Sequence, residues 1–186
     1  VFQALGSVLD LSLGTVDAFI VSMVSYASSS NSTWPFVTLP NHAVRVAKIS
    51  SLSKALLIQQ YQVVSEEDRA DWEIYANENK GWVEDVLVTQ INDVIFEGWK
   101  NITEFDPTSP GILYGTELSE PNSGPYTPSW QGYPLVPTFL AYNWNGIQDH
   151  KVGPGLQKVI DDREVIFTEI INLPDPNDPL SQVAVN

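Results

Sequence analysis

Six aromatic side chains lie close together in the second half of the chain, between positions 126 and 144. Prolines and side chains that carry an amide or a hydroxyl group are interleaved with them. Small-molecule pockets are mostly apolar with a few placed polar groups, and Tyr and Trp supply both kinds of surface. The pattern predicts a wall of a ligand pocket, and ordinary core packing is the alternative, because strands also favour aromatic residues. The predicted ligand-binding residues are Tyr126, Trp130, Tyr133, Tyr142, Asn143 and Trp144.

Residues suited to catalysis are few. The chain has no cysteine, which excludes disulfides, thiolate zinc sites, iron–sulfur clusters and cysteine nucleophiles. The two histidines, His42 and His150, are more typical of surface or capping positions than of a catalytic site. Asp161 and Asp162, before a predicted strand, are the best acid pair for a carbohydrate hydrolase, which needs two carboxylates across a sugar. We therefore expect no enzyme activity, no cofactor and no metal site.

The composition is that of a globular domain with a strongly acidic surface. The chain has 186 residues, 43% of them hydrophobic, and a formal net charge of -14. Residues 1–64 carry a net charge of +1, and residues 65–186 carry a net charge of -15. A surface this acidic repels phosphate backbones, so nucleic-acid binding is excluded.

Two glycosylation sequons indicate the compartment. They begin at Asn31 and Asn101 and predict an extracellular chain or one at the outer face of the plasma membrane. The most apolar stretch, residues 9–26, is interrupted by Asp10 and Asp17, so no stretch is expected to span a membrane. Membrane contact is expected only through flanking segments outside this sequence.

Proline and glycine divide the chain into two parts. Of 13 prolines, 11 lie from position 107 onward, and glycine is absent from residues 15–80. Both residues interrupt helices, so residues 1–106 are predicted to form a helical layer with a long first helix. Residues 107–186 are predicted to form a small sheet and loop-rich lobe within the same cooperative domain. The expected helices are residues 2–27, 42–60, 65–79 and 83–97, and the expected strands are residues 111–115, 135–144 and 164–172.

Two short motifs mark expected boundaries between these elements. Ser65 is followed by Glu66, Glu67 and Asp68, which is close to a capping box and predicts the start of a helix. Gly153-Pro-Gly155 predicts a turn. The order of helices followed by strands predicts an α+β fold, with the helical layer packed on a small antiparallel sheet.

Three stretches together resemble a known family. They are STWPFVTLP from Ser32, EEDRADWEIY from Glu66 followed by Gly81-Trp82, and YTPSWQGYP from Tyr126 with YNWN from Tyr142. The set resembles the extracellular sensor region of receptor-type adenylate and guanylate cyclases of diatoms and related algae. The resemblance covers roughly residues 20–145 and implies a Cache-like (extracellular PAS-like) ligand-binding lobe after a long helix. It implies no catalytic residue here, because cyclase chemistry belongs to a separate cytoplasmic domain.

Two functions follow from these features. The first is an extracellular ligand-sensing domain of a receptor-type cyclase-like protein, which binds a small molecule and signals through its N-terminal helix. The second is a structural glycoprotein subunit of an extracellular assembly. The expected partners are a small-molecule ligand and further copies of the chain, in a homodimer or larger homo-assembly through the first helix. The helix residues expected to contact neighbouring copies are Phe2, Leu5, Leu9, Leu13 and Phe19.

Overall fold

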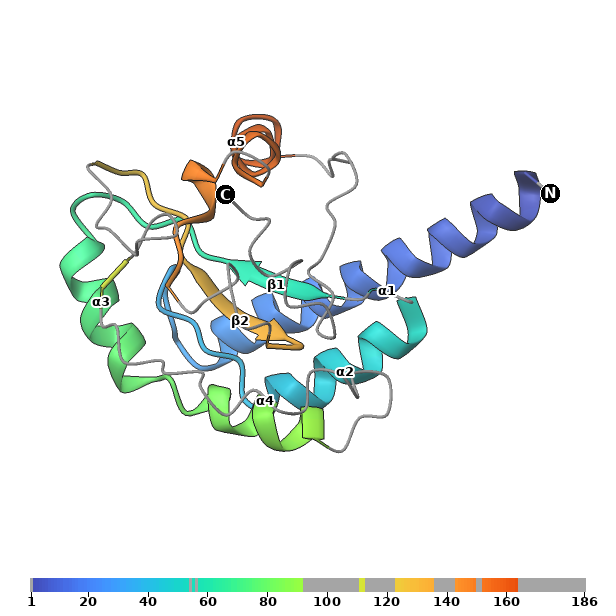
Figure 1. Ribbon diagram of the computed structural model, residues 1–186, viewed down its shortest axis with the longest axis horizontal. Coiled ribbons are helices and arrows are strands. Elements are labelled where there is room, and N and C mark those ends of the chain that lie inside the picture. The colour runs from blue at the N-terminus through green and yellow to red at the C-terminus, as the bar shows by residue number, and fades with distance from the viewer. Residues whose placement is uncertain are drawn as a thin grey trace, which may run out of the picture.

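The computed structural model describes residues 2–53, 55, 57–91, 111–112, 123–135, 143–149 and 152–163, with side chains in the first helix from Leu11 onward. Within these residues the fold is α+β, as predicted, and combines five α-helices with a small two-stranded antiparallel sheet (Figure 1). The elements are α1 (Phe2–Ser29), α2 (His42–Ser53), β1 (Ile58–Tyr61), α3 (Arg69–Glu78), α4 (Trp82–Ile91), β2 (Ser129–Tyr133), the 3₁₀ helix η2 (Gly146–Gln148) and α5 (Gly153–Asp162).

The sheet joins the two halves of the chain, because β1 comes from the first and β2 from the second. Isolated bridges continue the pairing beyond the two strands, so that residues 58–64, 126–133 and 143–145 lie side by side. The paired residues are Ile58 with Tyr133, Gln59 with Gly132, Tyr61 with Ser129, Val64 with Tyr126 and Pro128 with Asn145.

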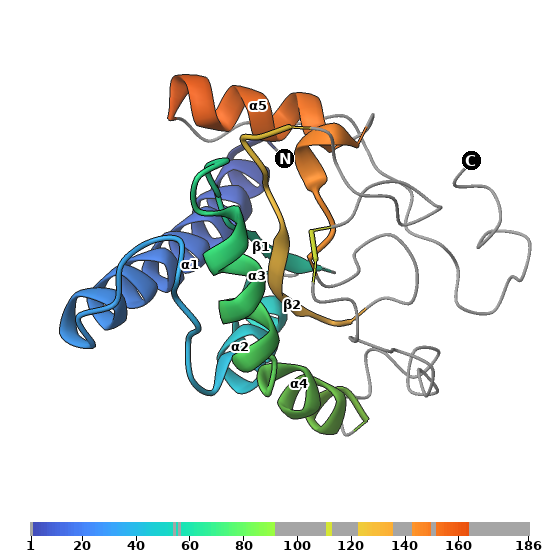
Figure 2. The same cartoon turned by 90° about the vertical axis from the view of Figure 1, so that its left-hand side faces the viewer.

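Helices lie on both sides of this sheet. In Figure 1, α2 and α4 lie on one side of the strands and α5 lies on the opposite side. The two views together show α1 running along the outside of α2, with its N-terminal end projecting beyond the other elements (Figures 1 and 2). Phe19, Met23 and Ala27 are the buried apolar residues of α1. Phe19, which we expected to contact neighbouring copies, is therefore buried within its own chain.

The second helix ends earlier than predicted. α2 stops at Ser53, and residues 58–60 of the predicted helix belong to β1 instead. Serine hydroxyls at the end of α2 bond to the backbone: Ser53 Oγ donates to the carbonyl of Ile49 at 2.8 Å, and Ser50 Oγ donates to that of Ala55 at 2.5 Å. Such bonds compete with helical hydrogen bonding. Pairing with β2 then decides the conformation of the residues that follow.

The helix predicted to start at Ser65 starts later. α3 begins at Arg69, and its N-cap residue, Asp68, makes no side-chain capping hydrogen bond. Ser65 instead closes a turn before the helix: the backbone N–H of Asp68 donates to Ser65 Oγ at 3.1 Å, and the Ser65 hydroxyl donates to Asp68 Oδ2 at 2.8 Å. The motif therefore predicted the local hydrogen bonds but not the first residue of α3.

The second half differs from the sequence prediction in two places. β2, Ser129–Tyr133, pairs with β1 in a stretch where no strand was expected. The strand expected at residues 135–144 falls mostly outside the described residues. The turn expected at Gly153-Pro-Gly155 is the first turn of α5, a place where proline is tolerated because the first helical N–H groups have no partner in the helix. Residues 92–97, 113–115, 136–142 and 164–172 lie outside the described residues.

The expectation that no stretch is suited to span a membrane is also wrong. Leu11–Ser29 is long and apolar enough to cross a membrane, judged by length and composition alone. Asp10 precedes this stretch, which leaves Asp17 as its only charged residue. A signal sequence and the core helix of a soluble protein meet the same criteria.

Candidate functional site

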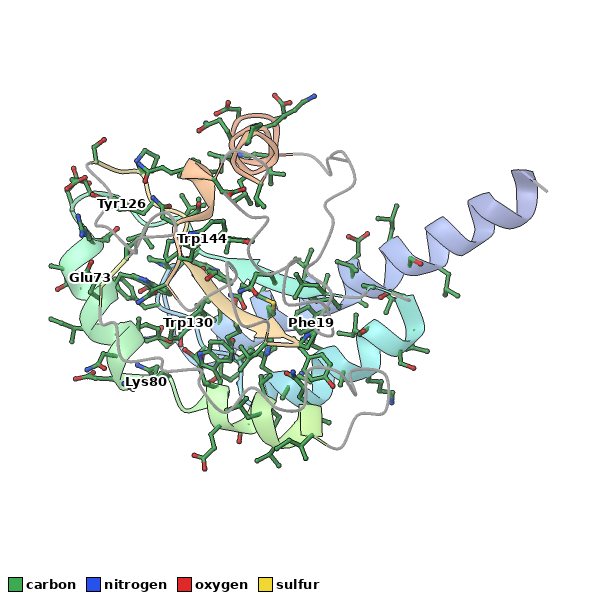
Figure 3. All side chains as sticks on the ribbon, in the orientation of Figure 1. Phe19, Glu73, Lys80, Tyr126, Trp130 and Trp144 are labelled. Carbon is green, nitrogen blue, oxygen red and sulfur yellow. The ribbon has the colours of Figure 1, made fainter. Side chains whose placement is uncertain are left out.

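The predicted ligand-binding residues are packed into the interior. Tyr126, Trp130, Tyr133 and Asn143 have no exposed surface, and Trp144 is 4% exposed. Figure 3 shows Trp130 and Trp144 inside the molecule, close to the strands. Tyr142 lies outside the described residues. The aromatic cluster is thus part of the core, and the polar groups beside it are the ones left to consider for ligand contact.

Trp130 of β2 lies at the centre of the aromatic core. The centroid of its ring is 5.1 Å from that of Trp72, 5.8 Å from that of Trp82 and 6.0 Å from that of Tyr75. Its indole N–H donates to the carbonyl of Val37 at 3.1 Å. These contacts join β2 to α3, α4 and the segment that precedes α2.

Tyr126 and Glu66 fasten the segment before β2 to the start of α3. The Tyr126 hydroxyl and the Gly124 N–H both donate to Glu66 Oε2 at 2.7 Å. Arg69 lies over the Tyr126 ring, with Cζ 5.1 Å from the centroid. The hydrogen bond from Tyr126, followed by that from Gly124, lowers the pKa of Glu66. Burial, followed by the bond to Glu66, raises the pKa of Tyr126. These contacts hold the segment before β2 against the start of α3, and we call them the Tyr126 latch.

Amide side chains around the sheet hold hydrogen-bonding atoms that lack a partner among the described residues. Gln62, Asn143 and Asn145 are each at most 2% exposed. Buried polar groups normally have a partner, and an unpaired one costs about 1–3 kcal/mol. The unpaired atoms are the nitrogens Gln60 Nε2, Gln62 Nε2, Asn143 Nδ2 and Asn145 Nδ2 and the oxygens Gln60 Oε1 and Gln148 Oε1. We call these five residues the amide cluster.

The two asparagines of the amide cluster are held in defined orientations. Asn143 Oδ1 accepts from the indole N–H of Trp72 at 3.0 Å, and Asn145 Oδ1 accepts from the backbone N–H of Thr127 at 2.7 Å. Because each oxygen is fixed by a donor, each NH₂ group points away from that donor. Asn143 has φ of 60°, a left-handed conformation that Asn tolerates better than most residues.

The pairing pattern places two members of the amide cluster on one face of the sheet. The Gln62 N–H donates to the carbonyl of Pro128 at 3.1 Å, and Pro128 pairs with Asn145. Residues directly opposite one another on antiparallel strands share a face, and so do residues two apart on one strand. Gln62 and Asn145 therefore share the face that carries Val64, a core residue. Gln60 lies at the irregularity between Gln59 and Tyr61, where this rule does not apply.

His42 is a buried residue that sequence reasoning placed wrongly. Its ring is 1% exposed and lies between Phe19 of α1 and Trp82 of α4, with centroid distances of 6.0 and 6.2 Å. Neither ring nitrogen has a hydrogen-bond partner. Burial lowers the pKa of His42 to about 3. Val46, one helical turn later, is also buried, and this spacing is a sequence signal that could have predicted the burial of His42. His150 lies outside the described residues.

The acid pair and the sequons have surface positions. Asp161 and Asp162 are exposed residues at the end of α5, and Asp161 Oδ1 accepts from Gln157 at 2.9 Å. The strand expected after them lies outside the described residues. Asn31 is exposed directly after α1, whereas Asn101 lies outside the described residues.

Within the described residues, no group of three or more His, Asp or Glu side chains is arranged to hold a metal ion. The residues that sequence reasoning missed are Gln60, Gln62, Asn145 and Gln148, whose partners on the sheet are far away in the sequence. A comparison of this chain with protein-family models, with curated proteins and with solved structures finds no match.

Proposed function

We propose that this chain is an extracellular ligand-sensing domain, with a sheet that is the described part of a Cache-like lobe. The amide cluster is the observation that carries the proposal. Five amide side chains with unused hydrogen-bonding atoms, next to a packed aromatic core, suit a site that gains a polar partner on binding. The resemblance to the sensor region of receptor-type cyclases supports the same function and an outer location.

Contacts between rings lead from the amide cluster to α1. Trp72 bonds to Asn143 and packs on Trp130, and Trp130 packs on Trp82. His42 lies between Trp82 and Phe19 of α1. A ligand that changes the packing of these rings changes the free energy with which α1 packs against the rest of the chain. The shift in population is limited by the difference in ligand affinity between the two arrangements.

Thermal unfolding and amide hydrogen exchange test the sensor function together. A panel of amino acids, amines and neutral metabolites is added to the folded chain, and the unfolding midpoint is measured for each compound. We expect a compound that raises the midpoint and also changes exchange in α1 near Phe19. A folded sample that no compound stabilises contradicts the proposal, and so does a binder that leaves α1 unchanged.

A structural subunit of an extracellular assembly is the second candidate, because α1 exposes apolar side chains. They are Leu11, Leu13, Ile20, Val21 and Val24. Association with further copies through α1 would cover them. Sedimentation separates the two functions: a large polymer that forms without ligand favours the assembly, and a monomer or dimer favours the sensor.

A further inference from the structure

We propose that the fold contains an acid-operated switch, in which protonation of His42 releases α1 from α2 while the rest of the chain stays folded. The inference goes beyond the sensing function, because the signal is a proton and no small-molecule ligand is needed. It rests on the place of His42 between the helices, on the charges of the elements around it and on the way α1 is held.

His42 lies at the junction of three helices. It is the first residue of α2, and its ring is 1% exposed. The ring lies between Phe19 of α1 and Trp82 of α4. His42 is thus part of the contact by which α1 packs on the rest of the chain. A charge that develops on this ring develops inside that contact.

The surroundings of His42 favour the neutral imidazole. A buried imidazolium loses its hydration, and aromatic rings attract a cation only modestly by comparison. The first turn of a helix carries partial positive charge, which disfavours a further positive charge at the start of α2. In agreement with this, burial lowers the pKa of His42 from 6.5 to about 3.

No charged side chain of the described elements around His42 is placed to compensate a charge on its ring. β2 also packs on α2 and α4, and it contains no charged residue. The charged residues described on the three helices are all exposed: Asp17 of α1, Arg45 and Lys48 of α2, and Glu84 and Asp85 of α4. The tyrosine side chains of α1 and β2 are uncharged at mildly acidic pH. Protonated His42 therefore gains no ion pair in the packed state.

α1 is held by few buried side chains. It runs along the outside of α2, and its buried apolar residues are Phe19, Met23 and Ala27 (Figures 1 and 2). The side that carries Ile20 and Val24 is exposed. Peripheral elements with few buried contacts open at a lower free energy than the core does. Release of α1 therefore does not require the remaining elements to unfold.

The coupling between protonation and release sets the size of the effect. Release brings His42 into contact with water and returns its pKa from about 3 toward 6.5, so the released state binds the proton first as the pH falls. Between pH 7.5 and pH 5, a full return of the pKa raises the ratio of released to packed α1 by about thirtyfold. Carboxyl groups in model peptides titrate near pH 4, below this range.

Thiol labelling at chosen positions measures the release. The chain has no cysteine, so an introduced thiol is its only one. Met23→Cys and Ala27→Cys place it on the packed side of α1, Val24→Cys on the exposed side, and Val86→Cys at a buried position of α4. Each folded variant is labelled with dithiodipyridine, an aromatic disulfide reagent, at pH 7.5 and at pH 5. The rate at Val24→Cys corrects for the change of thiol reactivity with pH.

The release of α1 predicts a loss of protection on one helix only. Between pH 7.5 and pH 5, we expect protection at Met23→Cys and Ala27→Cys to fall by about ten- to thirtyfold relative to Val24→Cys. Protection at Val86→Cys should stay nearly constant. Unchanged protection on the packed side of α1 overturns the inference. An equal loss at Val86→Cys also overturns it, because the whole chain then opens together.

Histidine substitutions assign the switch to His42. In the Ala27→Cys background, His42→Leu and His42→Gln each remove the titrating ring, and protection should then be independent of pH. His150→Gln removes the only other histidine of the chain and should keep the full pH dependence. A dependence that survives without His42, or is lost without His150, overturns the assignment. In the unmodified chain, NMR signals of the His42 and Phe19 rings should change together as the pH falls, and titration of His42 near its ordinary pKa with Phe19 unchanged also overturns it.

The switch and the sensing function fail separately. A chain that releases α1 in acid but binds no compound of the panel contradicts the sensing function and supports the switch. A chain that a compound stabilises, with protection of α1 that does not depend on pH, overturns the switch and leaves the sensing function standing.

Discussion

The indole N–H of Trp72 donates a hydrogen bond of 3.0 Å to Oδ1 of Asn143, a residue 71 positions later in the chain. Both residues are fully buried, and the bond joins α3 to the third segment of the sheet. It satisfies the indole inside the core and fixes which side of the Asn143 amide carries the NH₂ group. One hydrogen bond thus links core stability to the geometry of the amide cluster.

Replacing Trp72 by phenylalanine tests this bond. Trp72→Phe keeps a ring in the core but leaves Asn143 Oδ1 without its donor. We expect the free energy of unfolding to fall by about 1–3 kcal/mol, the cost of an unpaired buried group. Urea denaturation measures the change. Trp34→Phe is the control, because Trp34 is 48% exposed and should be nearly neutral. Equal effects of the two substitutions would contradict the role of the bond.

His42 should make stability depend on pH. Its pKa is lowered from 6.5 in the unfolded chain to about 3 in the folded protein by burial. As the pH falls, His42 therefore binds a proton in the unfolded chain before it does so in the folded protein. The part of the free energy of unfolding that depends on neutral His42 is fully present above pH 6.5. It is lost as the pH falls toward 3, at about 1.4 kcal/mol per pH unit.

The variant His42→Leu isolates this contribution. The difference in unfolding free energy between His42→Leu and the unmodified chain should move in favour of the variant as the pH falls from 7 to 5, across the ordinary pKa of 6.5. Urea denaturation at several pH values measures it. All other titrating groups are shared by the two proteins, so a difference that is constant with pH would show that His42 is not buried as described.

Tyr126→Phe tests the hydrogen bond to Glu66 in the Tyr126 latch, which joins the segment before β2 to the start of α3. The hydrogen bond from Tyr126 is the main cause of the lowered pKa of Glu66, so its removal should raise that pKa toward 4.5. A carboxylate with a lowered folded pKa stabilises the protein above its unfolded pKa, and this contribution is lost as the pH falls. NMR titration of the Glu66 carboxyl carbon measures the change. Tyr61→Phe, which removes no bond to Glu66, should leave the titration unaltered.

Polar substitutions on the exposed side of α1 test the assembly. Ile20 and Val24 are 50% and 49% exposed, so Ile20→Ser and Val24→Ser should reduce self-association without lowering the unfolding midpoint appreciably. Phe19→Ser should instead destabilise the monomer, because Phe19 is buried against α2. Sedimentation velocity and thermal unfolding measure both effects. An unchanged size distribution for the Ile20 and Val24 variants would argue against association through this side of α1.

Asn31 is expected to carry a glycan when the chain is made in a eukaryotic secretory pathway. It is exposed and lies directly after α1, and N-glycans attach to surface positions. Mass spectrometry of the unmodified chain and of Asn31→Gln should differ by one glycan. Identical glycan content in the two proteins would remove one support for the extracellular location.

Local sequence patterns determined the parts of the fold that depend on near neighbours. The apolar spacing of α1, α2 and α4 predicts helices because residues three and four apart share a helix face. The turn that Ser65 closes before α3 involves only a residue three positions away. The α+β class follows from the distribution of proline and glycine, since these residues interrupt helices wherever they occur.

Only the tertiary structure decided β1, the rings that surround His42 and the amide cluster. Residues 58–60 continue a pattern that suits a helix, and their pairing with β2 some seventy positions later overrides it. The rings of Trp72 and Trp130 are also far apart in the sequence, and they come into contact only where α3 and β2 pack together. Gln62 and Asn145 have no local sign of a shared site, because Pro128, which lies between them, comes from a third segment. Contacts between distant segments are set by which surfaces can be buried together, and that information is spread over the whole chain.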